Sequence, residues 1–129
     1  MHMTPADRIK YKDLYIRTAR EYLDKLSTRV SLLLQNNYGD ENIRAIFISA
    51  HSLCSQSAVI GYENISKYAS IIEKSFGKKE EADMFISDKT RLQTIQTGIE
   101  KLRESVDEIE RSGEEMDLSR EIEELEGIL

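Results

Sequence analysis

Four segments of this chain repeat apolar residues every three or four positions, which is the spacing of an amphipathic helix. The most regular segment runs through Leu92, Ile95, Ile99, Leu102, Val106 and Ile109. β-Branched residues do not alternate with polar ones as a half-buried strand would require, and tryptophan is absent. With 129 residues, one proline and 40% hydrophobic residues, the chain is long enough for one domain with a single core. The sequence therefore predicts an all-α protein.

Start and stop signals bound these helices, which we expect over about residues 5–35, 41–60, 63–76 and 88–112. Thr4 and Pro5 suit the start of the first helix, and Asp40 and Ser87 suit the N-caps of the second and fourth. Gly61 marks a tight connection between the second and third helices. Four amphipathic helices joined by short loops predict an antiparallel four-helix bundle.

The two ends of the chain are set apart from this bundle, which we expect over residues 4–112. Residues 1–3 read as a start methionine followed by a cloning remnant. The tail at 113–129 is acidic, and its apolar residues repeat with helical spacing. We expect a short additional helix there, with a linker or partner-binding tail as the alternative. The charged residues 78–84 are predicted to form a loop or a short helical turn.

Composition argues against several classes of function. The net charge is −6 and the basic residues form no stripe, so a nucleic-acid binder is not expected. No apolar run approaches the roughly 18 residues of a membrane span, and no secretory signal is present. Cys54 is the single cysteine, which excludes an internal disulfide and a cysteine-rich zinc site. We therefore expect a cytoplasmic protein without a membrane segment.

His51 is the candidate reactive residue, because His2 belongs to the expected cloning remnant. On a helical wheel His51 lies at the seam between the apolar face and the solvent-facing side. The outer sector beside it carries Ile48, Val59 and Tyr62, which are apolar or amphipathic where polar residues would be usual, and the small Ser52. We expect these four residues to contact a partner protein. A purely structural role for the histidine is the alternative.

Glu73 is the expected partner of His51. His51 lies ten residues before Gly61 and Glu73 twelve residues after it, so an antiparallel helix pair brings the two to similar heights. A carboxylate that accepts one ring N–H leaves the other ring nitrogen with a free lone pair. Without His51 opposite, Glu73 would read as an ordinary solvated glutamate.

Several separated positions resemble one known family, the histidine-containing phosphotransfer (Hpt) domain. The motif positions are Ala50, His51, Leu53, Gly61 and Glu73, at the family's spacings. Within that family the chain most resembles the N-terminal phosphotransfer domain of chemotaxis histidine kinases, with helix order and lengths agreeing over about residues 8–111. The resemblance implies that His51 is phosphorylated and that Glu73 orients it by a hydrogen bond.

Three positions near the site depart from the family pattern. Cys54 stands where the family has a lysine, Ser55 where it has a glycine, and Ser70 where the chemotaxis subgroup often has a second histidine. Phosphorylation adds a charge of about −1.5 to −2. A nearby cation at 4 Å contributes roughly 1–4 kcal/mol, depending on the dielectric. Arg44, about two helical turns before His51, is a distant substitute for the lysine.

The resemblance implies a phosphocarrier of a two-component, chemotaxis-type phosphorelay. Such a domain needs no cofactor of its own, because ATP and Mg²⁺ come with its partners, a histidine kinase ATP-binding domain and a response-regulator receiver domain. It is expected to be a monomer without autonomous catalysis, alone or as part of a histidine kinase. The alternatives are a degenerate Hpt-like domain that docks a partner without being phosphorylated and a helical domain whose apolar stripes serve self-association.

Overall fold

The computed structural model describes residues 3–129, so residues 1 and 2 of the expected cloning remnant lie outside the described residues. The described part of the chain is helical and contains no strand, which confirms the all-α prediction. Its helices are α1 (Pro5–Leu34), α2 (Asp40–Ile60), α3 (Glu63–Ser75), α4 (Lys79–Ile86), α5 (Lys89–Ser112) and α6 (Ser119–Gly127).

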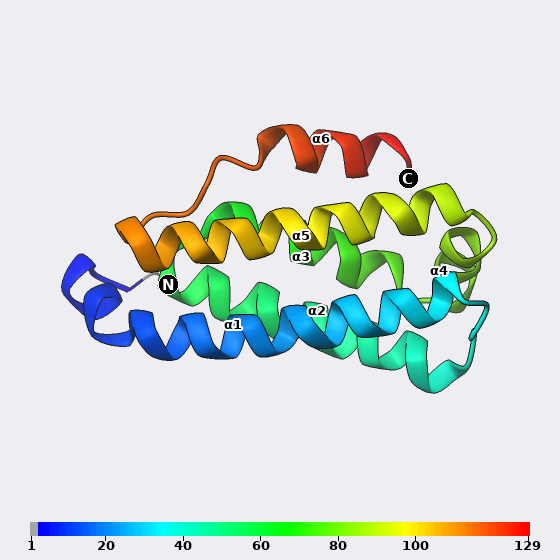
Figure 1. Ribbon diagram of the computed structural model, residues 1–129, viewed down its shortest axis with the longest axis horizontal. Coiled ribbons are helices and arrows are strands. Elements are labelled where there is room, and N and C mark those ends of the chain that lie inside the picture. Colours follow the sequence, from blue (N-terminus) through cyan, green and yellow to red (C-terminus); the bar gives the residue numbers. More distant parts are fainter. Residues whose placement is uncertain (1–2) are drawn as a thin grey trace.

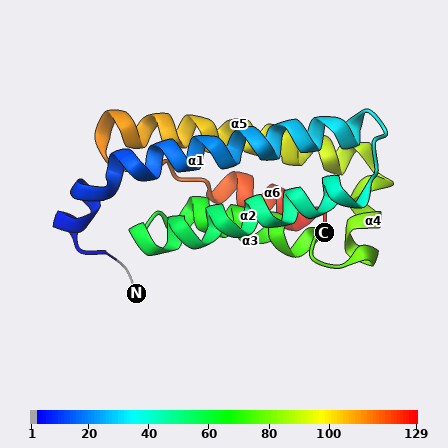
Figure 2. The same cartoon turned by 90° about the horizontal axis from the view of Figure 1, so that it is seen from below.

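The four longest helices run side by side, as Figures 1 and 2 show. α1 packs against α2 on one side and against α5 on the other, and α2 packs against α3. α6 lies along the outside of α3 and α5, where it buries Ile122 and Leu125. The apolar stripes predicted from the sequence converge on one core, whose fully buried members include Leu23, Leu26, Leu33, Ile46, Leu53, Ile65, Ile72, Leu92 and Ile95.

Helix starts agree with the predicted capping chemistry at one position and differ at two. The Thr4 hydroxyl accepts a hydrogen bond from the Asp7 N–H at 3.2 Å, as expected for an N-cap. The predicted caps Asp40 and Ser87 are wrong by one residue each. Gly39 caps α2, which leaves Asp40 in the first turn, where a carboxylate favours the helix dipole. Asp88 caps α5 by accepting from the Thr90 N–H at 2.9 Å.

The segment predicted as a loop or short turn is the eight-residue helix α4. Two apolar residues three positions apart, Ala82 and Phe85, are buried on its inner side. The Phe85 ring meets the ring of Phe76, at the end of α3, with centroids 5.6 Å apart. α4 therefore closes one end of the helix assembly.

The buried apolar stripe of α1 begins well after the start of the helix. Ile9 is 80% exposed and Leu14 is still 51% exposed, whereas Tyr15 is buried. The first turns of α1 extend past the end of α2 and α3, as both ribbon views show, so no neighbouring helix covers them.

α2 is the one helix among the described residues that is long and apolar enough to cross a membrane. This is weak evidence, because the core helix of a soluble protein can meet the same criteria. Only 33% of its most apolar 18-residue window is buried inside the molecule. Two large apolar side chains of α2, Ile48 and Val59, are each 48% exposed.

Candidate functional site

The α2–α3 hairpin is fixed by the geometry of its turn. Gly61 adopts a left-handed conformation with φ of 95°, and the N–H groups of Gly61 and Tyr62 donate to the last carbonyls of α2. A side chain at Gly61 would also collide with the guanidinium of Arg8, whose Nε donates to the Ile60 carbonyl at 2.9 Å. The turn thus favours glycine for its backbone conformation, and a side chain there would also displace the flexible end of Arg8.

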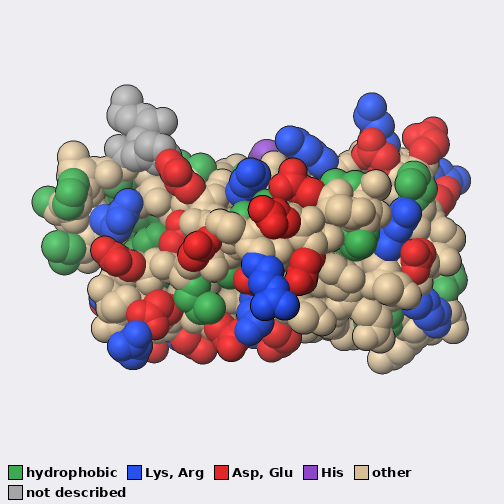
Figure 3. All heavy atoms as spheres, turned by 90° about the horizontal axis from the view of Figure 1, so that it is seen from above, with side chains coloured by type: hydrophobic (Ala, Val, Ile, Leu, Met, Phe, Trp, Pro, Cys, Tyr) green, Lys and Arg blue, Asp and Glu red, His purple; other side chains and the backbone are tan. Residues whose placement is uncertain are grey.

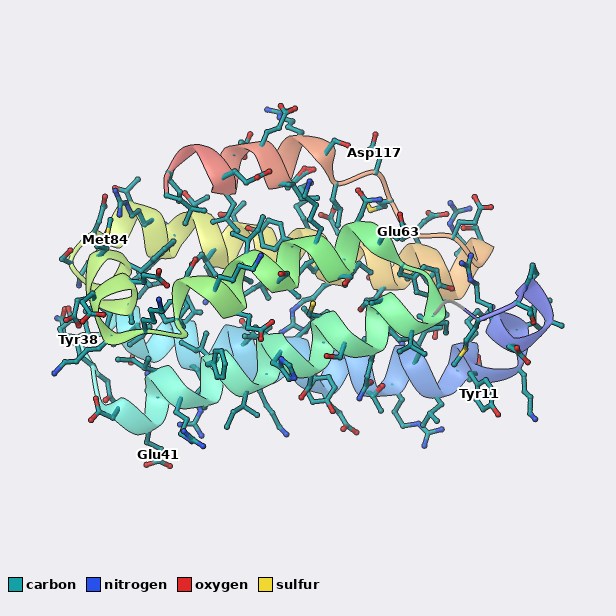
Figure 4. The ribbon with its side chains drawn as sticks, turned by 180° about the vertical axis from the view of Figure 1, so that it is seen from behind. Tyr11, Tyr38, Glu41, Glu63, Met84 and Asp117 are labelled. Atoms are coloured by element: carbon teal, nitrogen blue, oxygen red, sulfur yellow. The ribbon has the colours of Figure 1, made fainter. Side chains whose placement is uncertain are left out.

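This hairpin brings His51 of α2 and Glu73 of α3 together. Nδ1 of His51 lies 2.7 Å from Oε2 of Glu73, so the pairing predicted from their distances along the chain is present. The histidine side chain is 60% exposed and the glutamate 21% exposed. Figure 4 shows this side of the molecule, with α2 and α3 in front and side by side. The Phe47 ring stacks against the imidazole, with centroids 6.4 Å apart.

The contact determines which ring nitrogen is free. A carboxylate oxygen accepts a hydrogen bond, so in the neutral ring this contact favours the tautomer with the proton on Nδ1 and the lone pair on Nε2. Glu73 and Phe47 together restrict rotation of the ring. The site therefore presents a nucleophilic nitrogen on an oriented, exposed imidazole.

Cys54, at the position of the family's lysine, turns toward α3. Its Sγ lies 3.6 Å from the Oγ of Ser66, and that hydroxyl donates to the Cys54 carbonyl at 3.0 Å. Ser70 is half-buried one turn before Glu73. Ser55 and Arg44 are exposed on the same side of α2 as His51.

Three of the four predicted docking residues lie near the surface, and one does not. Ile48 and Val59 are each 48% exposed and Ser52 is half-buried. Tyr62 is buried, and its hydroxyl donates to the Gly113 carbonyl at 3.1 Å. The prediction for Tyr62 is wrong because the chain leaves its helical path at Gly61, beyond which a helical wheel no longer gives the direction of a side chain.

A groove of about 340 Å³ lies between α1 and α2 and was not predicted from the sequence. Ser55 and Val59 line it from α2, and the partly exposed Tyr11 and Leu14 line it from α1. Ser55, the lining residue nearest to His51 along α2, lies one helical turn after it. The available signal was the apolar character of Tyr11 and Leu14, three residues apart on a helix that was expected to bury its apolar residues.

No protein-family model, curated protein sequence or solved structure matches this chain. Within residues 3–129, no group of three His, Cys, Asp or Glu side chains is placed to hold a metal ion. The His51–Glu73 pair and its surroundings are therefore the features of this chain that bear on its function.

Proposed function

We propose that this chain is an Hpt-like four-helix bundle that carries a phosphoryl group on His51 in a two-component phosphorelay. The contact between Nδ1 of His51 and the Glu73 carboxylate, with the ring exposed, is the observation that supports this proposal most strongly. A structural histidine would be expected to be buried or to use both ring nitrogens in fixed contacts. The exposed ring instead offers a reaction partner access to Nε2.

In the proposed reaction, Nε2 of His51 attacks the γ-phosphorus of ATP bound to a partner kinase. A P–N bond forms and the P–O bond to the leaving ADP breaks. The ring becomes cationic because Nδ1 retains its proton, and the Glu73 carboxylate stabilises that positive charge. Transfer to an aspartate of a receiver domain breaks the P–N bond and returns the electron pair to Nε2. The partners supply ATP and Mg²⁺ in this scheme.

The exposed side of α2 is suited to hold these partners. Ile48, Ser55 and Val59 lie on the same side of α2 as His51, and Ser55 and Val59 also line the α1–α2 groove. These side chains are uncharged, and Ile48 and Val59 are each 48% exposed. Partly exposed apolar side chains around a polar reactive group are typical of protein contact sites.

The charge distribution favours approach to this side over the opposite one. Residues 80–129 contain 16 acidic and six basic side chains, whereas residues 3–79 contain 12 basic and eight acidic ones. Figure 3, which looks down on the side of α6, shows acidic side chains gathered there. An acidic receiver surface would be repelled by α5 and α6 and directed toward α1, α2 and α3.

The alternative is a module that docks the same partners without being phosphorylated. Its support is Cys54, which leaves the position of the family's lysine without a cation and contacts Ser66 instead. Under this alternative, His51→Gln would preserve both partner binding and signalling. Under the phosphocarrier proposal it would preserve binding alone.

The test is chemical phosphorylation of the isolated protein with potassium phosphoramidate, followed by labelling with ATP and histidine kinase domains. We expect an acid-labile, alkali-stable phosphate on His51, located by mass spectrometry under alkaline conditions. Glu73→Gln, which removes the proposed orienting carboxylate, serves as the control for unassisted reaction. A His51 that reacts no faster in the unmodified protein than in Glu73→Gln, and that kinases active on another substrate fail to label, would contradict the proposal.

A further inference from the structure

α3, the helix that carries Glu73, has no capping side chain of its own. It spans only 13 residues, and its N-cap residue Tyr62 makes no side-chain cap hydrogen bond. Isolated helices of about 12–15 residues or fewer are marginal in water, and uncapped N–H groups at a helix start lower their stability further. The beginning of α3 must therefore be stabilised from elsewhere in the molecule.

Glu115, in the linker between α5 and α6 (residues 113–118), supplies that stabilisation. Its Oε2 accepts from the Asn64 N–H at 3.1 Å and its Oε1 accepts from the Ile65 N–H at 3.0 Å. In return, the Asn64 side-chain oxygen accepts from the Leu118 N–H at 3.1 Å. A carboxylate from some 50 residues further along the chain thus acts as the cap of α3.

The rest of the linker is fixed by directed contacts of the same kind. Gly113 ends α5 in a left-handed conformation with φ of 86°, and its carbonyl accepts from the Tyr62 hydroxyl at 3.1 Å. The Met116 N–H donates to the Ser105 hydroxyl at 2.9 Å. The contact between Met116 and Ser105 fastens the linker to α5 next to Glu115, so Glu115 connects the start of α3 to α5.

The orientation of α3 matters for the site because a helix of this length moves nearly as a rigid rod. Its far end is held by the contact between Phe76 and Phe85, and Glu73 lies one turn before that end. If the N-terminal end is released, even a small reorientation of α3 within its packing would change the direction from the Glu73 carboxylate to Nδ1 of His51. Hydrogen bonds weaken steeply as their angle departs from linearity.

We propose that Glu115 is a positioning residue, which caps α3 so that Glu73 holds the His51 ring with its proton on Nδ1. This inference rests on the proposed role of Glu73. It makes the α5–α6 linker part of the functional unit, although it does not touch His51.

The experiment compares Glu115→Ala with Glu114→Ala, an exposed neighbour whose backbone N–H donates to the Ser112 hydroxyl at the end of α5. Two quantities are measured in the intact chain. The first is amide hydrogen exchange at Asn64 and Ile65, and the second is the ¹⁵N spectrum of the His51 ring, which reports the nitrogen that carries the proton. His51→Gln identifies the His51 signals.

We expect Glu115→Ala to speed exchange at Asn64 and Ile65 by about 2- to 30-fold, the range for loss of an N-cap, and to lower the fraction of His51 protonated on Nδ1. Glu114→Ala should change neither quantity. Faster amide exchange without a change in the His51 spectrum would mean that Glu115 is a structural cap only, and would overturn the proposal. Unchanged amide exchange at Asn64 and Ile65 would overturn it as well. If Glu115→Ala does not fold, Glu115→Gln, which keeps one acceptor oxygen, is judged by the same two measurements.

This test separates the inference from the proposed function, because neither measurement involves phosphate. A protein that resists phosphorylation but shows the expected spectra would contradict the phosphocarrier proposal alone. If the protein is phosphorylated on His51 but Glu115→Ala leaves the ring spectrum unchanged, only the positioning role is contradicted.

Discussion

The two ends of α3 each make a carboxylate contact with another element, and the surroundings of the two contacts differ. At one end Glu73 contacts the imidazole of His51, whose side chain is 60% exposed. At the other end Glu115 reaches in from the α5–α6 linker and binds backbone N–H groups in a half-buried place. The exposed contact leaves a nucleophile open to a visiting molecule, whereas the buried one offers nothing to react. Under the proposed function, one end of α3 performs the chemistry and the other maintains its geometry.

Removing the imidazole should have the largest effect on activity. His51→Gln is expected to abolish acid-labile labelling at this position, because no other side chain of the site offers an equivalent nitrogen. Stability should change by no more than about 0.5 kcal/mol, since the side chain is largely exposed. Labelling and urea unfolding of the same preparation check both points. Persistent acid-labile phosphate elsewhere in the described site would locate the nucleophile at another residue.

Removing only the charge of Glu73 should give a smaller loss. Glu73→Gln keeps the size of the side chain but cannot stabilise a cationic ring, so the phosphorylation rate should fall roughly 10- to 100-fold, the range for loss of a group that orients a histidine ligand. The initial rate with phosphoramidate measures this, with Lys74→Gln on the same helix as the control. A rate equal to that of the unmodified protein would mean that Glu73 has no part in the reaction.

The middle of α3 is held by a close contact with α5, which a single methyl group should disturb. The Tyr68 side chain of α3 occupies the space that a Cβ at Gly98 would need. Alanine is favoured over glycine in a helix by about 1 kcal/mol, but overpacking costs typically about 1–3 kcal/mol. We therefore expect Gly98→Ala to lower the free energy of unfolding, by roughly 1 kcal/mol, in urea titrations. Thr97→Ala, at the exposed neighbouring position, is the control, and a more stable Gly98→Ala protein would contradict the close contact.

The smallest expected effect is a pH dependence that belongs to the buried end of α3. Burial raises the pKa of Glu115 above its ordinary value of 4.5, although hydrogen bonds from Ile65 and Asn64 oppose the shift. Because the pKa is raised in the folded state, Glu115 contributes fully to stability below pH 4.5. This contribution decreases as the pH rises through the raised pKa.

Glu115→Gln cannot ionise, so its stability relative to the unmodified protein should increase between about pH 4 and pH 7. Urea unfolding of the two proteins at several pH values measures the difference, with Glu114→Gln as the control. A difference that falls with rising pH would mean that the ionised carboxylate is favoured by folding, contrary to the burial seen in the structure.

Residue spacing along the chain was sufficient to predict the His51–Glu73 contact at the exposed end of α3, but not the Glu115 contact at the buried end. His51 and Glu73 lie on consecutive helices joined by a glycine turn, so residue counts on either side of Gly61 predict their heights. Tyr62 was misplaced because one left-handed residue redirects the chain. The role of Glu115 depends on a contact across 50 positions, and an acidic residue in an acidic tail carries no sequence signal for it. The helices themselves followed from periodicity, and α4 was underestimated because only two of its residues are buried.

The most direct test of the central claim is the ¹⁵N spectrum of the His51 ring in the unmodified protein, recorded where the ring is neutral. The structure predicts a proton on Nδ1, hydrogen-bonded to Glu73, and a bare Nε2, with this preference reduced in Glu73→Gln. A spectrum with the proton on Nε2, or one that Glu73→Gln leaves unchanged, would contradict the claim that Glu73 orients a free Nε2 toward solvent.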